Sequence, residues 1–346
     1  MNERKQNPIK RILSTRGMGG ALTAFAGLIA IYIAFGIINP TVFSGQNIMN
    51  LLRSMSKYLL IGIGQSYILI TGNIDLSIGS VAGMSAMISA TLMTMGVHPI
   101  AAILITLACC LVIGVLNGLL VGKWKLPPFI ATLGTMFVAR GVAYIVNGNR
   151  NTDAIASGIG KEAADAFGNF FYYGSTLGIY NTFWIAIVLF VVFFFLLSKT
   201  RTGRHIYAIG SNADAAKLSG VSVLATTTKA YLVSAFCSCV VGFILCGQAG
   251  MGNMEAGNMY EMYGVAAGVI GGVSPLGGTG ILLGTLAGAA VWQTLENGLN
   301  MIGAQVGIQR LVIGIIVVGA VFLDVVVRNG AYRKKTVKHG SAPKAD

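Results

Sequence analysis

Side chains that could carry out catalysis or bind a metal are scarce in this sequence. The five cysteines sit inside apolar runs and never in the C-x-x-C spacing of a zinc or redox site. The three histidines are far apart, and no H-E-x-x-H pattern occurs. No phosphate-binding G-x-x-x-x-G-K-[ST] loop is present either, so we expect that the chain does not hydrolyse ATP itself. The residues therefore predict a protein that is not an enzyme and that holds no metal or cofactor of its own.

Carboxylates placed deep in membrane helices are typical of carriers that couple transport to ions. In this sequence only Asp75, Glu296 and Asp324 lie near apolar runs, and each can be interpreted as an end cap or an interfacial group. We therefore expect a solute pathway whose energy comes from another molecule. The alternative is a self-sufficient secondary carrier or facilitator for a small polar solute.

The composition shows which elements must position these residues. Only 10% of the 346 residues are charged, against about 25% in an ordinary soluble domain, and 55% are hydrophobic. A soluble protein this apolar would have too little polar surface to cover itself. A soluble enzyme, a disordered chain and a nucleic-acid-binding domain are therefore excluded, and we expect an all-α membrane protein.

Uncharged stretches of about 20 residues are long enough to cross a bilayer as helices. The sequence contains about ten apolar segments of roughly this kind. They are expected near 18–39, 48–70, 76–95, 99–122, 128–147, 181–198, 229–248, 260–274, 279–299 and 307–327. One transmembrane domain would then cover 18–328, between basic tails at 1–17 and 329–346.

The distribution of charge predicts the orientation of these helices. Cytoplasmic loops of membrane proteins are rich in Lys and Arg. With the N-terminus inside, most of the 24 basic residues fall in the two tails and in inner loops, above all in the loop 199–228. The longest outer loop, 148–180, carries acidic residues instead, at Asp153, Glu162 and Asp165. We therefore expect both termini on the cytoplasmic side.

Glycines at intervals of four residues predict close contacts between helices, because this spacing places small residues on one helix face. Two expected spans, the fourth and the ninth, contain such a series. The series are Gly114, Gly118 and Gly122 in the fourth span, and Gly280, Gly284 and Gly288 in the ninth.

A polar stretch at 71–77 predicts that one helix ends and another begins within the membrane domain. Gly72 and Asn73 are residues that commonly end helices, and Asp75 can cap the helix that follows. We expect a helix break at this point.

A second break is predicted at 271–278, which begins with Gly271 and Gly272. Met262–Leu295 contains no charge, and a helix of this length is about 50 Å long. Two crossings of a ~30 Å core need more than that. The eighth element therefore either begins earlier or is a half-crossing helix beside a translocation path. An ordinary tight loop at the inner surface is the alternative.

A short capped helix is predicted in the inner loop 199–228. Ser211 and Asp214 have the spacing of a capping box, and Gly220 suits the position just after a helix. The residues that continue the helix between them are Ala215, Ala216, Lys217 and Leu218. Small side chains let such a helix lie in a groove on another protein, so we expect a docking element. An idle surface helix is the alternative.

Four segments, in order along the chain, have the pattern of family motifs: 70–80 (ITGNIDLSIGS), 128–135 (PFIATLGT), 200–221 with its TRTGR and AAKLSGV runs, and 270–278 (IGGVSPLGG). Together they resemble the membrane permeases of ribose-type, monosaccharide-importing ABC transporters. The resemblance covers nearly the whole chain, from about 40 to 328. One departure is Asn73, where the family pattern usually has glycine.

The resemblance implies the rest of a transport machine. Two permease subunits, expected to be a homodimer, would surround a central path in the bacterial cytoplasmic (inner) membrane. A separate cytoplasmic ATPase would hold ATP and magnesium, and an extracytoplasmic binding protein would deliver the sugar. The helix within 210–221 would be the coupling helix that enters the ATPase.

An uncharged sugar needs hydrogen-bonding groups and apolar faces rather than strong charges. Side chains of this kind inside the expected spans are the candidates for the substrate pathway. They are Gln65, Asn117, Phe129, Thr132, Thr135, Gln293, Asn297 and Asn300. The alternative for each polar residue is a hydrogen bond between helices.

Overall fold

A computed structural model describes residues 18–312, 314–316 and 318–319 of the chain. Helices dominate, with one antiparallel hairpin of β1 (Ser175–Thr176) and β2 (Ile179–Tyr180). The α-helices are α2 (Met18–Ile38), α3 (Gly45–Ile70), α4 (Ile78–Thr94), α5 (Pro99–Gly122), α6 (Pro128–Ile145), α7 (Ala156–Ile159), α8 (Lys161–Gly168), α9 (Asn181–Lys199), α10 (Arg201–Ser211), α11 (Ala213–Leu218), α12 (Val223–Ala249), α13 (Tyr260–Ile270) and α14 (Leu282–Met301). A 3-10 helix, η1 (Pro40–Phe43), and a π-helix, η2 (Asn169–Tyr173), lie between them.

Five helices among the described residues are long and apolar enough to cross a membrane, namely α2, α5, α6, α9 and α12. The prediction of an all-α membrane protein is therefore confirmed. Most expected spans coincide with helices to within a few residues. The exception is the eighth, because α13 has only eleven residues and is about 16 Å long, too short for a full crossing. The two basic tails lie outside the described residues, and so do Asp324 and the part of the tenth expected span, 307–327, from residue 320 on.

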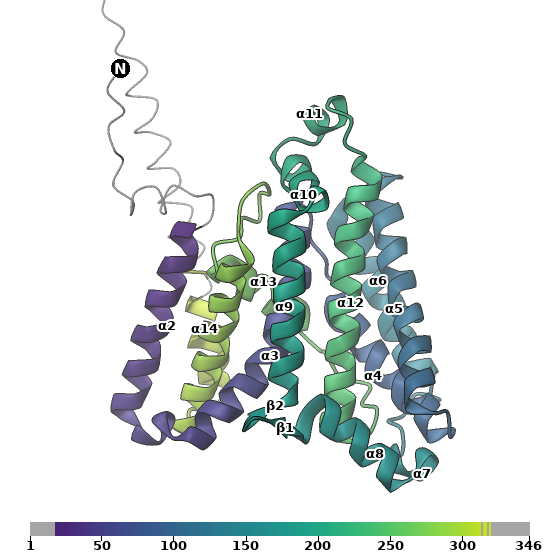
Figure 1. Cartoon of the computed structure of the whole chain (residues 1–346), viewed down its shortest axis with the longest axis vertical. Helices are drawn as coiled ribbons and strands as arrows, with labels where there is room; N and C mark the ends of the chain where they lie inside the picture. The colour runs from purple at the N-terminus through teal and green to yellow at the C-terminus, as the bar shows by residue number, and fades with distance from the viewer. Residues whose placement is uncertain (1–17, 313, 317, 320–346) are drawn as a thin grey trace, which may run out of the picture.

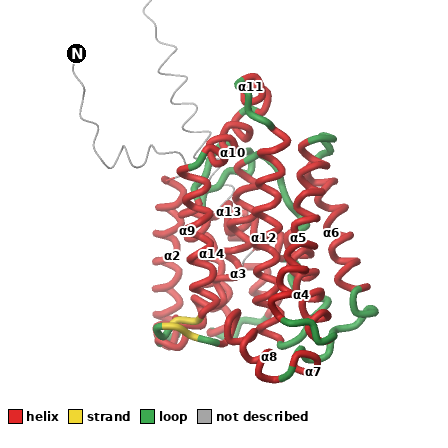
Figure 2. The backbone as a smooth tube through the Cα atoms, turned by 45° about the vertical axis from the view of Figure 1, so that its right-hand side comes forward, coloured by secondary structure: helices red, strands yellow, loops and turns green. Residues whose placement is uncertain are grey.

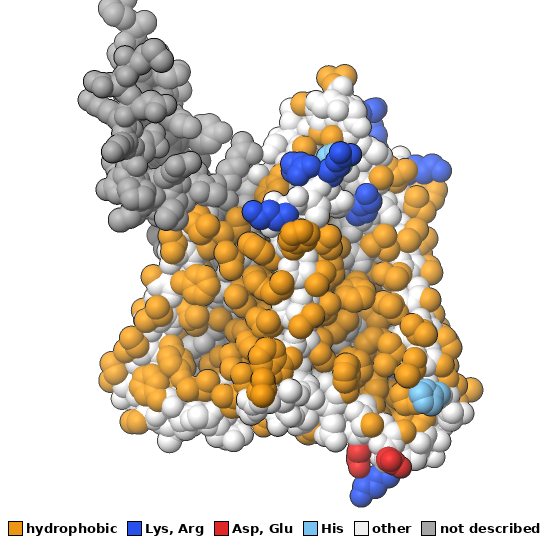
Figure 3. Space-filling model, in the orientation of Figure 1, with side chains coloured by type: hydrophobic (Ala, Val, Ile, Leu, Met, Phe, Trp, Pro, Cys, Tyr) orange, Lys and Arg blue, Asp and Glu red, His pale blue; other side chains and the backbone are white. Residues whose placement is uncertain are grey.

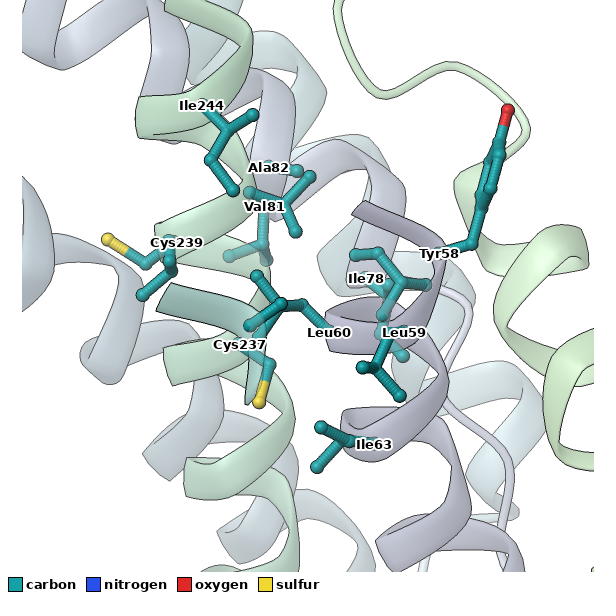
Figure 4. Packing of buried hydrophobic residues seen from close by; sticks show 14 of the residues in the cluster. Tyr58, Leu59, Leu60, Ile63, Ile78, Val81, Ala82, Cys237, Cys239 and Ile244 are labelled. Atoms are coloured by element: carbon teal, nitrogen blue, oxygen red, sulfur yellow. The ribbon is translucent and has the colours of Figure 1, made fainter. Parts of the chain in front are cut away.

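The centre of the bundle is formed by α3 and α12. Every residue from Tyr58 to Ile70 of α3 is buried. In α12, 78% of the most apolar 18-residue stretch is buried inside the bundle. The corresponding share is only 22–28% in α2, α5, α6 and α9. Those four therefore lie at the periphery of the bundle. Figure 4 shows Leu60 and Ile63 of α3 in the same buried cluster as Cys237 of α12.

Both expected helix breaks are present. Between α3 and α4 the chain turns at Gly72, whose φ of +77° is the left-handed conformation that glycine adopts easily. Between α13 and α14 a loop of turns connects the two helices across 271–281. Because Gly280 lies in this loop and not in α14, the expectation that it shares a helix face with Gly284 is wrong.

Glycines mark the closest approaches between helices. A Cβ at Gly114 or Gly118 would lie within 3 Å of atoms of α12, so these residues let α5 and α12 pack backbone to backbone. Gly284 and Gly271 pack against each other in the same way, and Gly272 packs against Gly20 of α2. Small residues therefore set the spacing of α5 against α12 and of α13 against α14.

The two ends of the bundle differ in structure and charge. α10 and α11 project at one end, whereas α7, α8 and the β1–β2 hairpin lie at the opposite end (Figures 1 and 2). In Figure 3 most of the blue Lys and Arg side chains gather at the α10–α11 end, whereas the red acidic side chains lie at the other end, next to a blue one. We call these the α11 end and the hairpin end.

Candidate functional site

The α11 helix stands at the tip of the α11 end. Its N-cap is Asn212, whose Oδ1 accepts a hydrogen bond from the backbone nitrogen of Ala215 at 2.8 Å. The predicted capping box at Ser211 is therefore wrong, because Ser211 is the last residue of α10 and the new helix begins one residue later. Gly220 has a φ of +82° and ends the helix as predicted. The helix is short but is capped at both ends.

Leu218 is the most exposed large apolar side chain at this end, with 90% of its surface accessible. Ala216, by contrast, is only 5% exposed and packs toward the rest of the chain. Asp214 and Lys217 are exposed on the same short helix. The exposed surface of α11 thus consists of the apolar Leu218 side chain with the charged Asp214 and Lys217 beside it. Ala216 lies on the buried face of the helix.

α10 lies directly on both helix breaks. Gly210 packs against the carbonyl oxygen of Ile70 at the end of α3, and the backbone nitrogen of Gly278 donates to that same oxygen at 2.9 Å. The hydroxyl of Tyr207 donates to the carbonyl oxygen of Gly280 at 2.6 Å. Burial raises the pKa of Tyr207 to about 12, so its phenol keeps the proton that it donates.

Gly72 and Gly277 complete this junction, because a Cβ at Gly277 would lie 2.9 Å from the Gly72 backbone. We call the contacts among Gly72, Tyr207, Gly210 and the loop 276–280 the glycine junction. Backbones in direct contact, with no side chains between them, have little space in which to move relative to one another. α10 is therefore in direct contact with the end of α3 and with the loop that joins α13 to α14.

Asp75 is the centre of a buried polar network. Its Oδ1 accepts bonds from the backbone nitrogen and the hydroxyl of Ser77 at 2.9 and 2.6 Å, and its Oδ2 accepts from the hydroxyl of Ser234 on α12 at 2.7 Å. Asn117 donates to the Ser77 hydroxyl at 3.0 Å and accepts from Thr135 at 2.6 Å. The network joins the first break to α5, α6 and α12.

The other predicted pathway residues lie in different surroundings. Thr132 donates to its own helix at the carbonyl of Pro128, and Phe129 is 52% exposed on the bundle surface. Asn297 exchanges hydrogen bonds with Asn47 of α3, at 3.0 and 3.1 Å. Asn300 accepts a bond from Gln309 at 2.8 Å. The structure therefore does not gather all eight residues in one place.

Gln65 and Gln293 differ from these because their side-chain groups lack partners among the described residues. Both polar atoms of the fully buried Gln65 are unpaired, as is Oε1 of Gln293. An unpaired buried amide is costly, by about 1–3 kcal/mol for each lost partner. Such groups are candidates for hydrogen bonding to water or solute when the helices around them separate.

An aromatic and charged cluster around Tyr58 was not anticipated from the sequence. Tyr58 donates to Glu296 at 2.7 Å, and its ring lies within 6.4 Å of Trp292, Tyr260 and Tyr263. Its members come from α3, α13 and α14, far apart in the sequence. The only available signal was that Tyr260 and Tyr263 are one helical turn apart.

Two basic residues of α3 are matched by partners nearer the hairpin end. The Arg53 guanidinium lies 4.1 Å from the ring centroid of Tyr180 and 4.5 Å from that of Tyr172. Lys57 donates to Gln248 at 3.1 Å. Stacking on aromatic faces and bonding to amides are ways of keeping cations at a membrane border. No group of His, Cys, Asp or Glu among the described residues could hold a metal ion.

A family model described as "Branched-chain amino acid transport system / permease component" matches residues 47–321. The chain belongs to this family. The match includes the helix breaks, the polar network, α10 and α11. As a permease component the chain is a transport subunit, not an enzyme, and a multi-pass integral membrane protein.

Individual relatives within this permease family carry names of sugars. The ribose import permease of Bacillus subtilis is 36% identical over 322 residues, which cover 93% of this chain and 98% of the relative. The galactose/methyl galactoside import permease of Escherichia coli is 34% identical, covering 91% and 96%. The D-allose transport system permease of Escherichia coli is 32% identical, covering 86% and 89%. No solved structure matches this chain.

Proposed function

We propose that this chain is the membrane subunit of an ABC importer that moves a monosaccharide of the ribose type across the bacterial inner membrane. The observation that carries the proposal is the connection of α11 to both helix breaks through the glycine junction. The relatives support a sugar as the solute, because ribose, allose and galactose appear in their names and the chain aligns with nearly their full length. The amino acids in the family description are the less favoured cargo.

The charge distribution supports an orientation with the α11 end in the cytoplasm. Lys199, Arg201, Arg204 and Lys217 lie on or next to α10 and α11 in the sequence, and Figure 3 shows Lys and Arg side chains gathered at that end. Cytoplasmic loops are enriched in Lys and Arg, so this end faces inward. In this orientation the hairpin end faces the outside, where a binding protein would deliver the sugar. About ten spans with both termini inside remain our expectation for the whole chain.

In this proposal ATP binding and hydrolysis on a separate subunit move α11. The exposed Leu218 enters a groove on that subunit, and Asp214 and Lys217 orient the helix beside it. Closure of two ATPase subunits draws the α11 helices of two permease subunits together. The glycine junction then shifts α13 and α14 relative to α3, which changes the side to which the path opens.

Near Gln65 and Gln293 the solute meets amide and aromatic groups. Gln65 and Gln293 have unpaired amide atoms, and the aromatic cluster around Tyr58 offers apolar ring faces for the C–H groups of a sugar. The network of Asp75, Asn117 and Thr135 is already paired, so it positions the first break and does not bind solute. A second copy of the chain would supply the other half of the path.

The docking step is tested with a matched pair of variants. Burying a leucine side chain contributes about 1.5–3 kcal/mol. Leu218→Asp should therefore weaken binding of the partner ATPase by about 10- to 150-fold and reduce uptake accordingly. Leu177→Asp is the control, because Leu177 is 87% exposed at the hairpin end. Equal ATPase affinity for the two variants in detergent would contradict docking through α11.

A self-sufficient carrier is the second candidate function. Uptake measured with the purified chain in liposomes decides between this carrier and the ABC permease. Liposomes that contain the chain alone should show no uptake of ribose, allose or galactose. Uptake should appear only when the ATPase, ATP and a binding protein are added. Concentrative uptake by the chain alone would favour the secondary carrier.

A further inference from the structure

Residues 250–259 do not cross the surface between α12 and α13 but descend into the bundle. At the hairpin end this segment is hydrogen-bonded to the outer loop, where the nitrogens of Thr152 and Ile155 donate to the carbonyls of Gly252 and Gly250 at 3.0 and 2.9 Å. We call 250–259 the re-entrant segment. It leads directly into α13, whose first residue is Tyr260.

Glycine contacts trace the descent along α4. A Cβ at Gly252 would lie 2.9 Å from Ala90, and one at Gly83 would lie 2.5 Å from the carbonyl oxygen of Ala256. Gly257 packs directly on the carbonyl of Gly79, near the other end of the same helix. From residue 90 to residue 79 of α4 is about 16 Å. The segment therefore extends about half-way through a ~30 Å hydrocarbon core.

Two side chains of α6 bind the re-entrant segment, Arg140 at its backbone and Tyr144 at the exposed Glu255. One terminal nitrogen of Arg140 donates to the carbonyl oxygens of Met254 and Ala256, both at 2.9 Å. The hydroxyl of Tyr144 donates to Glu255 at 2.6 Å. Irregular backbone at membrane depth needs such partners, because lipid offers it none.

The outer face of the segment is polar and exposed. Asn253, Glu255 and Asn258 are all exposed, although the segment descends within the membrane region of the bundle. Polar side chains and non-helical backbone are stable at this depth only against protein or water. Met259 and Met262, at 42% and 55% exposed, continue the same region with apolar surface.

We propose that the exposed face of the re-entrant segment lines a water-filled cleft, open at the hairpin end, in which an uncharged polyhydroxylated solute binds on its way through the permease. The Glu255 carboxylate accepts hydrogen bonds from solute hydroxyls. The two methionines contact the C–H faces of the solute. Arg140 and Tyr144 are positioning residues, since they act by fixing the segment. The inference rests on the proposed function for the identity of the solute.

A pair of single-cysteine additions tests the cleft in the assembled complex. Asn258→Cys places a thiol on the exposed face, and Val191→Cys places one on the peripheral helix α9, where Val191 is 57% exposed. The unaltered chain gives the background from the native cysteines, which are buried or half-buried. A small charged methanethiosulfonate reagent, which reacts in water and not in lipid, is added from the outside.

We expect Asn258→Cys to react at least tenfold faster than Val191→Cys, and its modification to stop uptake while ATP hydrolysis continues. Equal, slow reaction at both positions would overturn the water-filled cleft. Complete modification of Asn258→Cys with unchanged uptake would overturn its place on the solute path. The proposed function is judged separately, by whether the unmodified complex takes up ribose, allose or galactose. The labelling rates report on the cleft even when it takes up none of them.

Discussion

Replacing Gly210 by alanine tests whether α10 transmits movement into the membrane domain. A Cβ at this position would overlap the carbonyl oxygen of Ile70 and lie 2.7 Å from the nitrogen of Gly278, so α10 must move away from both. Overpacking of this kind costs about 1–3 kcal/mol. Applied to one of two conformations, that energy changes their ratio by about 5- to 150-fold. Uptake should fall by a factor in this range.

The assay measures sugar uptake and ATP hydrolysis on the same proteoliposomes containing the assembled complex. Uptake per ATP hydrolysed is expected to fall in Gly210→Ala, because the ATPase still docks on α11. Gly134→Ala is the control, since an added methyl at Gly134 on α6 meets nothing within 4 Å. A folded Gly210→Ala complex with the uptake-to-hydrolysis ratio of the unaltered protein would refute transmission through the glycine junction.

Three further variants test the Asp75 network, the Arg140 contacts with the re-entrant segment and the Asn212 cap of α11. Asp75→Ala leaves the Ser77 and Ser234 hydroxyls without their acceptor, which costs ~1–3 kcal/mol for each hydroxyl. The midpoint of thermal unfolding in detergent should therefore drop clearly more than for Asp75→Asn. Equal midpoints for the two variants would contradict the network. Arg140→Met removes the two hydrogen bonds that the Arg140 guanidinium donates to the re-entrant segment, so amide hydrogen exchange in 250–259 should accelerate. Unchanged exchange would show that these two bonds do not hold the segment in place. Asn212→Ala removes a helix cap that contributes about 1 kcal/mol, so the affinity of the permease for its ATPase subunit should fall roughly fivefold. Full affinity would mean that α11 does not need this cap for docking.

The helices were predictable because a helix that crosses a membrane needs an uncharged stretch of about 20 residues. The predicted span 99–122 has the bounds of α5, and 128–147 ends within two residues of α6. Interruption at 71–77 was also predictable, because glycine, asparagine and aspartate occur there together. The sequence could not show that Asp75 is bound by Ser234, since that contact joins residues 159 positions apart.

The features that were missed depend on tertiary contacts. The capping residue of α11 was predicted one position early, because Ser211 and Asn212 are both good caps and only the end of α10 decides between them. Residues 250–259 fall between two expected spans, and nothing local in the sequence shows that their glycines pack against α4. The aromatic cluster was hidden for the same reason, with its rings contributed by three separate helices.

The most direct measurement locates α11 relative to the membrane and compares it with the opposite end. Leu218→Cys and Leu177→Cys place equally accessible thiols at the α11 end and the hairpin end. A membrane-impermeant thiol reagent added to intact cells should label Leu177→Cys at once and Leu218→Cys only after permeabilisation. Labelling of Leu218→Cys in intact cells would place α11 outside, where no ATP-driven subunit could reach it, and would contradict energy delivery through this helix.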